Sequence, residues 1–242
     1  MPHLIGYFPG GGGSKPVKKS FAESTWEEIS AVCKAGLASE YWALGDTKNM
    51  IDGDTTTALR IIGFDHDYVS DMASYGREKA GITLELVETN SSLNSQMLGT
   101  NYTSTGWYHS NSMYHSKVRY TLLPNYLANV VPDALKAVIV PVGKEFIYKE
   151  SGELSSVSDT LFILSANEVL GSYTSGYNSE GTQYAYYAAG NSRIKKTTNG
   201  TAVSWWTRSP FSSSTWTFIM DSGSVGKTYV SESKYVFPCM CI

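Results

Sequence analysis

The amino-acid sequence predicts an α+β protein, because helical patterns prevail early in the chain and short strand patterns prevail at its end. A first helix is expected from a capping box at Ser24 and Glu27, an apolar stripe over residues 26–33 and Gly36 where the helix stops. Strands and helices do not alternate regularly along the rest of the chain, and this favours an α+β arrangement over a parallel sheet.

The remaining elements follow from hydrophobic periodicity and from the positions of Gly and Pro. Strands are expected at 59–64, 82–87, 138–144, 159–164, 204–208, 215–221, 227–231 and 235–241. Further helices are expected over 110–123, ending before Pro124, from Pro132 onward, over 165–169 and over 181–189. Residues 90–108 read as a loop and 127–131 as a short turn.

The length of 242 residues suits one large domain or one domain with an appendage. Residues 1–20, with the run Gly10–Gly13, are typical of a flexible tether. Leu4, Ile5, Tyr7 and Phe8 are apolar for a plain spacer, so residues 1–20 either dock on a neighbouring chain or form a disordered start. Residues 21–242 are then the folded domain.

Charge and composition exclude several classes of partner. The net charge is −3, and the basic cluster Arg193, Lys195, Lys196 is too short to follow a phosphate backbone, so nucleic acid is not expected as a partner. No apolar run reaches the length of a membrane span, and the N-terminus lacks the pattern of a signal peptide. Folding in a reducing cytoplasm is therefore expected. The 17 Tyr and 6 Trp favour a binding protein.

No residue pattern identifies a catalytic centre, cofactor or metal site. Cys33, Cys239 and Cys241 have no C-x-x-C spacing, and Cys33 reads as a buried apolar residue. Asp65, His66 and Asp67 are the best candidates for metal or acid–base chemistry, but the favoured interpretation is a strand-end turn whose aspartates cap backbone N–H groups. His109 and His115 lack i, i+4 spacing. Neither a nucleophile elbow nor a phosphate loop occurs.

The segment from residue 205 to the C-terminus is the most distinctive part of the chain. In a strand, Trp205 and Trp206 face opposite ways, so that one can enter the core while the other contacts something else. Arg208 shares a face with Trp206 and is expected to stack on an aromatic ring or to pair with a carboxylate. Pro210 ends this strand.

The following residues, 211–235, mix large aromatic side chains with small hydroxyl-bearing ones, as recognition surfaces do. We call residues 211–235 the binding segment. The residues expected to contact a ligand are Phe211, Ser213, Thr215, Trp216, Phe218, Asp221, Lys227, Tyr229, Ser231, Glu232, Lys234 and Tyr235.

The order of several short motifs resembles a family of uncharacterised domains from gut Firmicutes and their phages. The resemblance spans roughly residues 24–242 and depends on the order of the motifs more than on any one of them. The matching stretches are 26–29, 34–41, 44–48, 62–67, 79–83, 106–107, 112–113, 161–165, 168–171, 181–187, 189–192 and 205–210.

That family is similar to the variable proteins of diversity-generating retroelements, which have a C-type lectin-like fold related to formylglycine-generating enzymes. The resemblance implies a C-type lectin-like fold with short helices and a small, mostly antiparallel sheet. It also implies a phage tail protein, assembled into a virion, that binds a host cell-surface protein or glycan through the binding segment. Attachment to other tail proteins through residues 1–20, and a homo-oligomer such as a trimer, are expected with it.

The chain departs from the family pattern in its last residues, where Pro238 is followed by Cys239, Met240, Cys241 and Ile242 instead of the usual x-Phe-Cys-Ile. Trp216, Lys227, Glu232 and Lys234 are also not reachable by adenine-directed mutation of an Asn codon, which puts active diversification there in doubt. The calcium-dependent sugar motifs of lectins are missing from the sequence. Two alternatives stay open: an enzyme that uses Cys239 and Cys241 or the region of Asp65–Asp67, and a structural virion protein without a ligand.

Overall fold

The computed structural model describes residues 18–50, 57–97, 116–148, 153–173, 180–212 and 215–242, and it is a mixed α and β fold. Most of the predicted arm at 1–20 therefore lies outside the described residues. Ser213, His109 and His115 also lie outside them. The helices are short: α1 (Trp26–Lys34), α2 (Ala38–Tyr41), α3 (Met72–Tyr75), the 3-10 turn η1 (Ser91–Leu93), the π-helix η4 (Val118–Leu122), α4 (Leu123–Asn129), α5 (Asp133–Lys136), α6 (Ala166–Leu170) and α7 (Ala185–Ala188).

The described strands form four small sheets, where the sequence predicted one. A four-stranded sheet has the order β1 (Thr47–Asn49), β2 (Ala58–Phe64), β3 (Ile82–Leu86), β14 (Cys239–Cys241). A five-stranded sheet has the order β12 (Val225–Tyr229), β11 (Thr215–Ile219), β10 (Trp205–Pro210), β13 (Ser233–Tyr235), β5 (Asn94–Gln96). The smaller sheets are β4 (Glu88–Thr89), β8 (Lys195–Thr197), β9 (Ala202–Val203), and the hairpin of β6 (Val142–Tyr148) and β7 (Glu153–Asp159).

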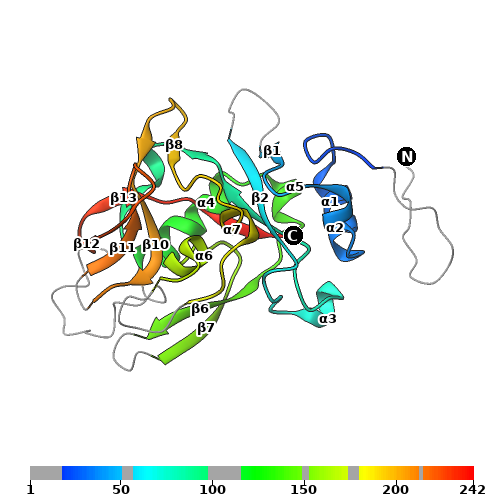
Figure 1. Ribbon diagram of the computed structural model, residues 1–242. Helices are drawn as coiled ribbons and strands as arrows, with labels where there is room; N and C mark the ends of the chain where they lie inside the picture. Colours follow the sequence, from blue (N-terminus) through cyan, green and yellow to red (C-terminus); the bar gives the residue numbers. More distant parts are fainter. Residues whose placement is uncertain (1–17, 51–56, 98–115, 149–152, 174–179, 213–214) are drawn as a thin grey trace.

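The pairing is mostly antiparallel, as expected. The described exceptions are β10 with β13 and β4 with β8, which pair in parallel. In Figure 1 the five-stranded sheet lies at one end of the molecule and α1 and α2 lie at the other, while the C-terminal strand β14, which pairs with β3, ends in the middle. One apolar core joins the two ends, from Phe21 and Trp26 near α1 to the last residue, Ile242.

Local signals located α1, α5 and α6, but the cap of α1 was predicted one residue too early, α2, α3 and η1 were not predicted, and the helix predicted over 181–189 is only α7. The capping box of α1 is formed by Thr25 and Glu28, and Ser24 instead donates its hydroxyl hydrogen bond to the Ser20 carbonyl, 2.9 Å away. Gly36 has a φ of 73°, which a side chain would disfavour, and it follows the helix as predicted. The predicted helix after Pro132 is confirmed as α5, and the predicted helix over 165–169 is confirmed as α6, with a capping box between Ser165 and Glu168.

Other boundaries were wrong because tertiary pairing overrides local pattern. Helical structure does not end before Pro124: η4 runs into α4, and Pro124 lies in the first turn of α4, where a missing N–H is tolerated. The expected loop 90–108 contains η1 and β5. The expected strand at 159–164 is only an extended path with one bridge, from Phe162 to Cys239, whereas β7 ends at Asp159. The predicted strand at 235–241 is two strands, β13 and β14, in different sheets.

Candidate functional site

The binding segment leaves the core at one strand and returns to it at another. All six residues of β10 are buried, and so are all residues from Val236 to Ile242. We call these two stretches, 205–210 and 236–242, the frame. Because both ends of the binding segment are fixed in the core, the frame determines where the segment begins and ends on the molecule.

The two tryptophans of β10 are both buried, so the prediction that one of them contacts something outside the core is wrong. The indole N–H of Trp205 donates to the carbonyl of Arg193 at 3.1 Å, and that of Trp206 donates to the carbonyl of Ser95 at 2.9 Å. Both faces of β10 are covered, because all six of its residues are buried. An alternating strand buried on both faces satisfies its polar groups internally.

Arg208 pairs with a carboxylate, as predicted, and the partner is Glu168 at the start of α6. The guanidinium donates to both carboxylate oxygens, at 2.5 and 2.8 Å, in a bidentate pair. It also donates to the carbonyls of Ile163 at 3.0 Å and Glu145 at 2.8 Å. The guanidinium therefore ties β10 to α6 and to β6.

Glu168 belongs to a larger buried group that sequence reasoning missed. The ammonium of Lys144, on β6, lies 2.7 Å from Glu168 and 2.7 Å from Asp67, which follows β2. We call Asp67, Lys144, Glu168 and Arg208 the charge cluster. Its two cations and two anions alternate in space, and the Tyr184 hydroxyl donates to Asp67 at 2.8 Å.

The interpretation of the Asp65–Asp67 triplet as a turn whose carboxylates cap backbone N–H groups is therefore wrong for Asp67. Its oxygens accept from Lys144, Tyr184 and Thr83 in the core. Asp65 pairs with Arg77 at 2.8 Å, and its φ of 46° bends the chain so that Asp67 turns inward. His66 stacks on the ring of Tyr184, with ring centroids 4.0 Å apart.

The charge cluster is held in its ionised form. Burial alone would raise the pKa of Glu168, but Arg208 and Lys144 lower it overall. Burial would likewise raise the pKa of Asp67, and Lys144 beside it lowers it overall. The pKa of Lys144 is raised because its two carboxylate partners outweigh the effect of burial. Such a cluster fixes β2, β6, α6 and β10 relative to one another.

A nearby carboxyl group behaves differently. Glu180 is buried, accepts from the backbone N–H of Ile147 at 2.9 Å and from the Ser209 hydroxyl, and has no bonded cation among the described residues. Burial raises the pKa of Glu180 to about 7. This carboxyl therefore changes its charge near neutral pH.

The cysteines are all buried free thiols, with Cys33 placed in the core as predicted. Cys239 and Cys241 lie on one face of β14, opposite Glu85 and Thr83 of β3. Burial raises the pKa of both thiols well above the usual value. The reactive thiolate is therefore not populated at neutral pH.

The structure divides the predicted ligand contacts into three groups. Trp216 is 0% exposed, and its indole N–H donates to the Thr207 carbonyl at 2.8 Å, so its assignment as a ligand contact is corrected to a core position. Ser213 lies outside the described residues. Half-buried positions are Phe211, Thr215, Phe218, Lys234 and Tyr235, and exposed positions are Asp221, Lys227, Tyr229, Ser231 and Glu232.

The exposed side of the binding segment centres on the edge strand β12. Lys227 and Tyr229 share one face of β12, and Tyr229 is 63% exposed. The Lys227 ammonium lies 3.8 Å from the centre of the Phe211 ring, and the Lys234 ammonium lies 5.2 Å from that of Phe218. One cation–π contact thus ties the start of the binding segment to β12, and the other ties its end to β11.

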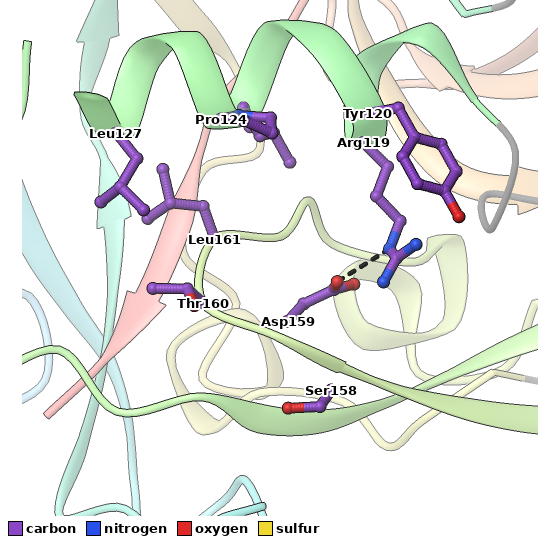
Figure 2. A pocket seen from close by; sticks show the side chains of 9 residues that line it. Arg119, Tyr120, Pro124, Leu127, Ser158, Asp159, Thr160 and Leu161 are labelled. Atoms are coloured by element: carbon purple, nitrogen blue, oxygen red, sulfur yellow. Dashed lines mark hydrogen bonds and ion pairs between the residues drawn. The ribbon is translucent and has the colours of Figure 1, made fainter. Parts of the chain in front are cut away.

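A cavity of about 280 Å³ lies elsewhere, between the η4–α4 helix and the chain that leaves β7 (Figure 2). Arg119 points from η4 toward Asp159 at the end of β7, and Tyr120 lies beside Arg119 at the edge of the cavity. The guanidinium of Arg119 donates to Asp159 at 2.8 Å. Sequence patterns gave no sign of this pair, because its members are 40 positions apart.

Within the described residues, no group of three or more His, Cys, Asp and Glu side chains is placed to hold a metal ion. None of the described helices has the length and apolar character that crossing a bilayer requires.

The curated proteins and the solved structures contain no match to this chain. Residues 84–242 match a protein family described as a domain of unknown function (DUF6273). The matched region runs from β3 to β14 and so includes the frame, the binding segment and the cavity. Because it covers about two thirds of the sequence, the chain belongs to the DUF6273 family.

Proposed function

We propose that this protein is a ligand-binding domain of a phage tail or virion, and that it contacts the host cell surface through the exposed part of the binding segment. The observation that carries the proposal is the contrast in burial within one continuous stretch. The frame is fully buried at both ends, whereas β12 and the turns beside it present charged and aromatic side chains to solvent. A C-type lectin-like fold, in which such a segment would serve recognition, is part of the same proposal.

The chemistry of the exposed side chains supports recognition of a partner. Tyr229 offers a rigid ring with a hydroxyl group; Lys227 shares its face of β12, and Glu232 lies in the turn that follows, so charges of both signs are near the ring. Interfaces obtain most of their affinity from a few such aromatic anchors. The cation–π contact of Lys227 with Phe211 holds part of this surface in place before a partner arrives, which lowers the entropy cost of binding.

The proposal is tested by Tyr229→Ala. Fluorescently labelled full-length protein is incubated with cells of the bacterium that carries the gene, and bound protein is measured by flow cytometry. Loss of an anchor is expected to weaken binding by about tenfold or more, with an unchanged melting temperature.

Tyr68→Ala is the matched control, because Tyr68 is also an exposed tyrosine (55%) with a lysine, Lys79, 4.8 Å from its ring centre. Equal binding by wild type, Tyr229→Ala and Tyr68→Ala would overturn the proposal.

The enzyme alternative has less support. Cys239 and Cys241 are enclosed thiols with raised pKa values, and the Asp67 carboxylate is occupied by Lys144, Tyr184 and Thr83. A nucleophile or general base needs access to a substrate. Neither group has that access in the structure.

A further inference from the structure

The cavity beside η4 has features that the proposed binding segment does not use. Its walls come from η4, α4 and the residues that end β7, none of which belongs to residues 211–235. Its volume of about 280 Å³ lies just below the lower end of the range for small-molecule sites, so it fits one small ring. Whatever binds there is independent of the binding segment.

An ion pair forms part of the cavity wall. The side chains of Arg119 and Asp159 are 14% and 10% exposed, so both charges are mostly withdrawn from water while still lining the cavity. Burial raises the pKa of Asp159, and Arg119 only partly offsets this effect. Unlike the charge cluster, which is enclosed in the core, this ion pair lines a cavity, so its polar atoms face a space that a ligand can enter.

The helix that supplies Arg119 and Tyr120 is itself unusual. Residues Val118–Leu122 form a π-helix that runs directly into α4. π-helical turns are rare and occur frequently at functional sites, since the wider turn re-aims the side chains that it carries. Here the wide turn directs two consecutive residues to the same cavity (Figure 2).

The chemistry of the walls indicates what the cavity accepts. Arg119 and Asp159 cancel each other in charge, so the site selects neither an anion nor a cation. Thr160, which follows Asp159, also lines the cavity and adds a hydroxyl group that both donates and accepts. The helix opposite contributes apolar surface from Leu123 and Leu127.

We propose that this cavity binds a single pyranose unit of a glycan. A pyranose is neutral, carries neighbouring hydroxyl groups that both donate and accept, and has C–H faces that pack on apolar side chains and on tyrosine. The Arg119–Asp159 pair and Thr160 bond the hydroxyl edge. The leucines contact the ring carbons, and Tyr120, 49% exposed, covers the open side.

Ligand-observed NMR on the full chain tests the proposal, with methyl α-glucoside, methyl β-galactoside and N-acetylglucosamine as probes. Saturation transfer is expected to at least one of them. Tyr120→Ala and Thr160→Val are each expected to weaken that binding by about three- to tenfold, the effect of losing one contact of this size. Tyr68→Ala is the control, since it removes an exposed tyrosine outside the cavity.

Two outcomes would overturn the proposal. One is that none of the three sugars shows transfer to folded wild-type protein. The other is that a sugar binds equally well to Tyr120→Ala and Thr160→Val, which would place its site elsewhere. Binding of Tyr229→Ala to the sugar should match wild type, so that failure of this proposal and failure of the cell-binding proposal are told apart.

Discussion

Strands β10 and β12 belong to the same sheet and are separated only by β11, yet they place their side chains in opposite environments. All six residues of β10 are buried, whereas β12 alternates between exposed and half-buried residues. β10 is central and β12 lies at the edge. Position in the sheet therefore decides which residues the fold needs and which it leaves available for a partner.

The difference extends to how polar groups are satisfied. Arg208 on β10 is bonded on all sides by Glu168 and by backbone carbonyls. Lys227 on β12 is exposed and contacts the ring of Phe211. Removing a buried charge leaves its partners unpaired, while removing an exposed one does not. Removal of a charged side chain should therefore lower the free energy of unfolding much more in β10 than in β12.

The largest effect is expected from Glu168→Ala. This change leaves Lys144 with one carboxylate fewer and leaves Arg208 without an ion-paired carboxylate among the described residues, and both cations are buried. A loss of about 3–5 kcal/mol in the free energy of unfolding is expected, enough to unfold a marginal protein. Urea denaturation followed by tryptophan fluorescence measures it.

Glu27→Ala is the control for that experiment, because Glu27 is exposed in the first turn of α1. It should change the free energy of unfolding by no more than about 0.5 kcal/mol. If both variants unfold at the same urea concentration, the charge cluster does not hold the fold together.

Trp216→Ala and Tyr229→Ala compare the core with the edge directly. Trp216 is fully buried on β11, so its truncation should cost about 3–5 kcal/mol. Tyr229 is mostly exposed, so its truncation should cost at most about 0.5 kcal/mol. Thermal unfolding of both variants checks this; equal losses would mean that β12 is as much a part of the core as β11.

These contrasts explain what the sequence could and could not predict. Caps, glycines and apolar stripes are local, and they located α1, α5 and α6. The local sequence does not distinguish Ser24 from Thr25 as the helix cap, because each of them is followed three residues later by Glu. Packing of the helix on the core decided for Thr25.

The charge cluster was beyond any local pattern. Asp67 and Lys144 are 77 positions apart, and only the folded chain brings them to 2.7 Å. The alternation of β11 predicted a binding aromatic at Trp216 as readily as a core one. Which face of β11 is covered depends on β10 and on the residues packed behind it, and one sequence does not carry that information.

A smaller effect, and one that depends on pH, is expected at Glu180. Its pKa is raised from about 4.5 to about 7 on folding, so between these values the folded protein binds more protons than the unfolded one. The contribution of Glu180 to the free energy of unfolding is fully present below pH 4.5 and is lost as pH rises through 7. The decrease in the free energy of unfolding is at most about 3 kcal/mol.

Glu180→Gln keeps the shape of the protonated side chain and removes the titration. The variant should therefore lose less stability than wild type between pH 5 and 8, as measured by melting temperature across that range. Asp67 and Glu168 have lowered pKa values, so their contribution is lost only in acid. Burial lowers the pKa of His66, which titrates alike in both proteins, so the difference between the two curves reports Glu180. Parallel curves for wild type and variant would contradict this.

The smallest effect is expected at the cation–π contact between Lys227 on β12 and Phe211, the first residue of the binding segment. Lys227→Met removes the charge 3.8 Å from the Phe211 ring, and an exposed contact of this kind stabilises by about 0.5–1 kcal/mol. Lys227→Arg keeps the charge and should keep the contact. Because Phe211 directly follows the frame, loss of the contact should broaden or shift its ring signals in NMR while those of Trp216 stay unchanged. If Lys227→Met and Lys227→Arg give the same Phe211 spectrum, the contact does not order this surface. The binding segment would then become ordered only when it binds a partner.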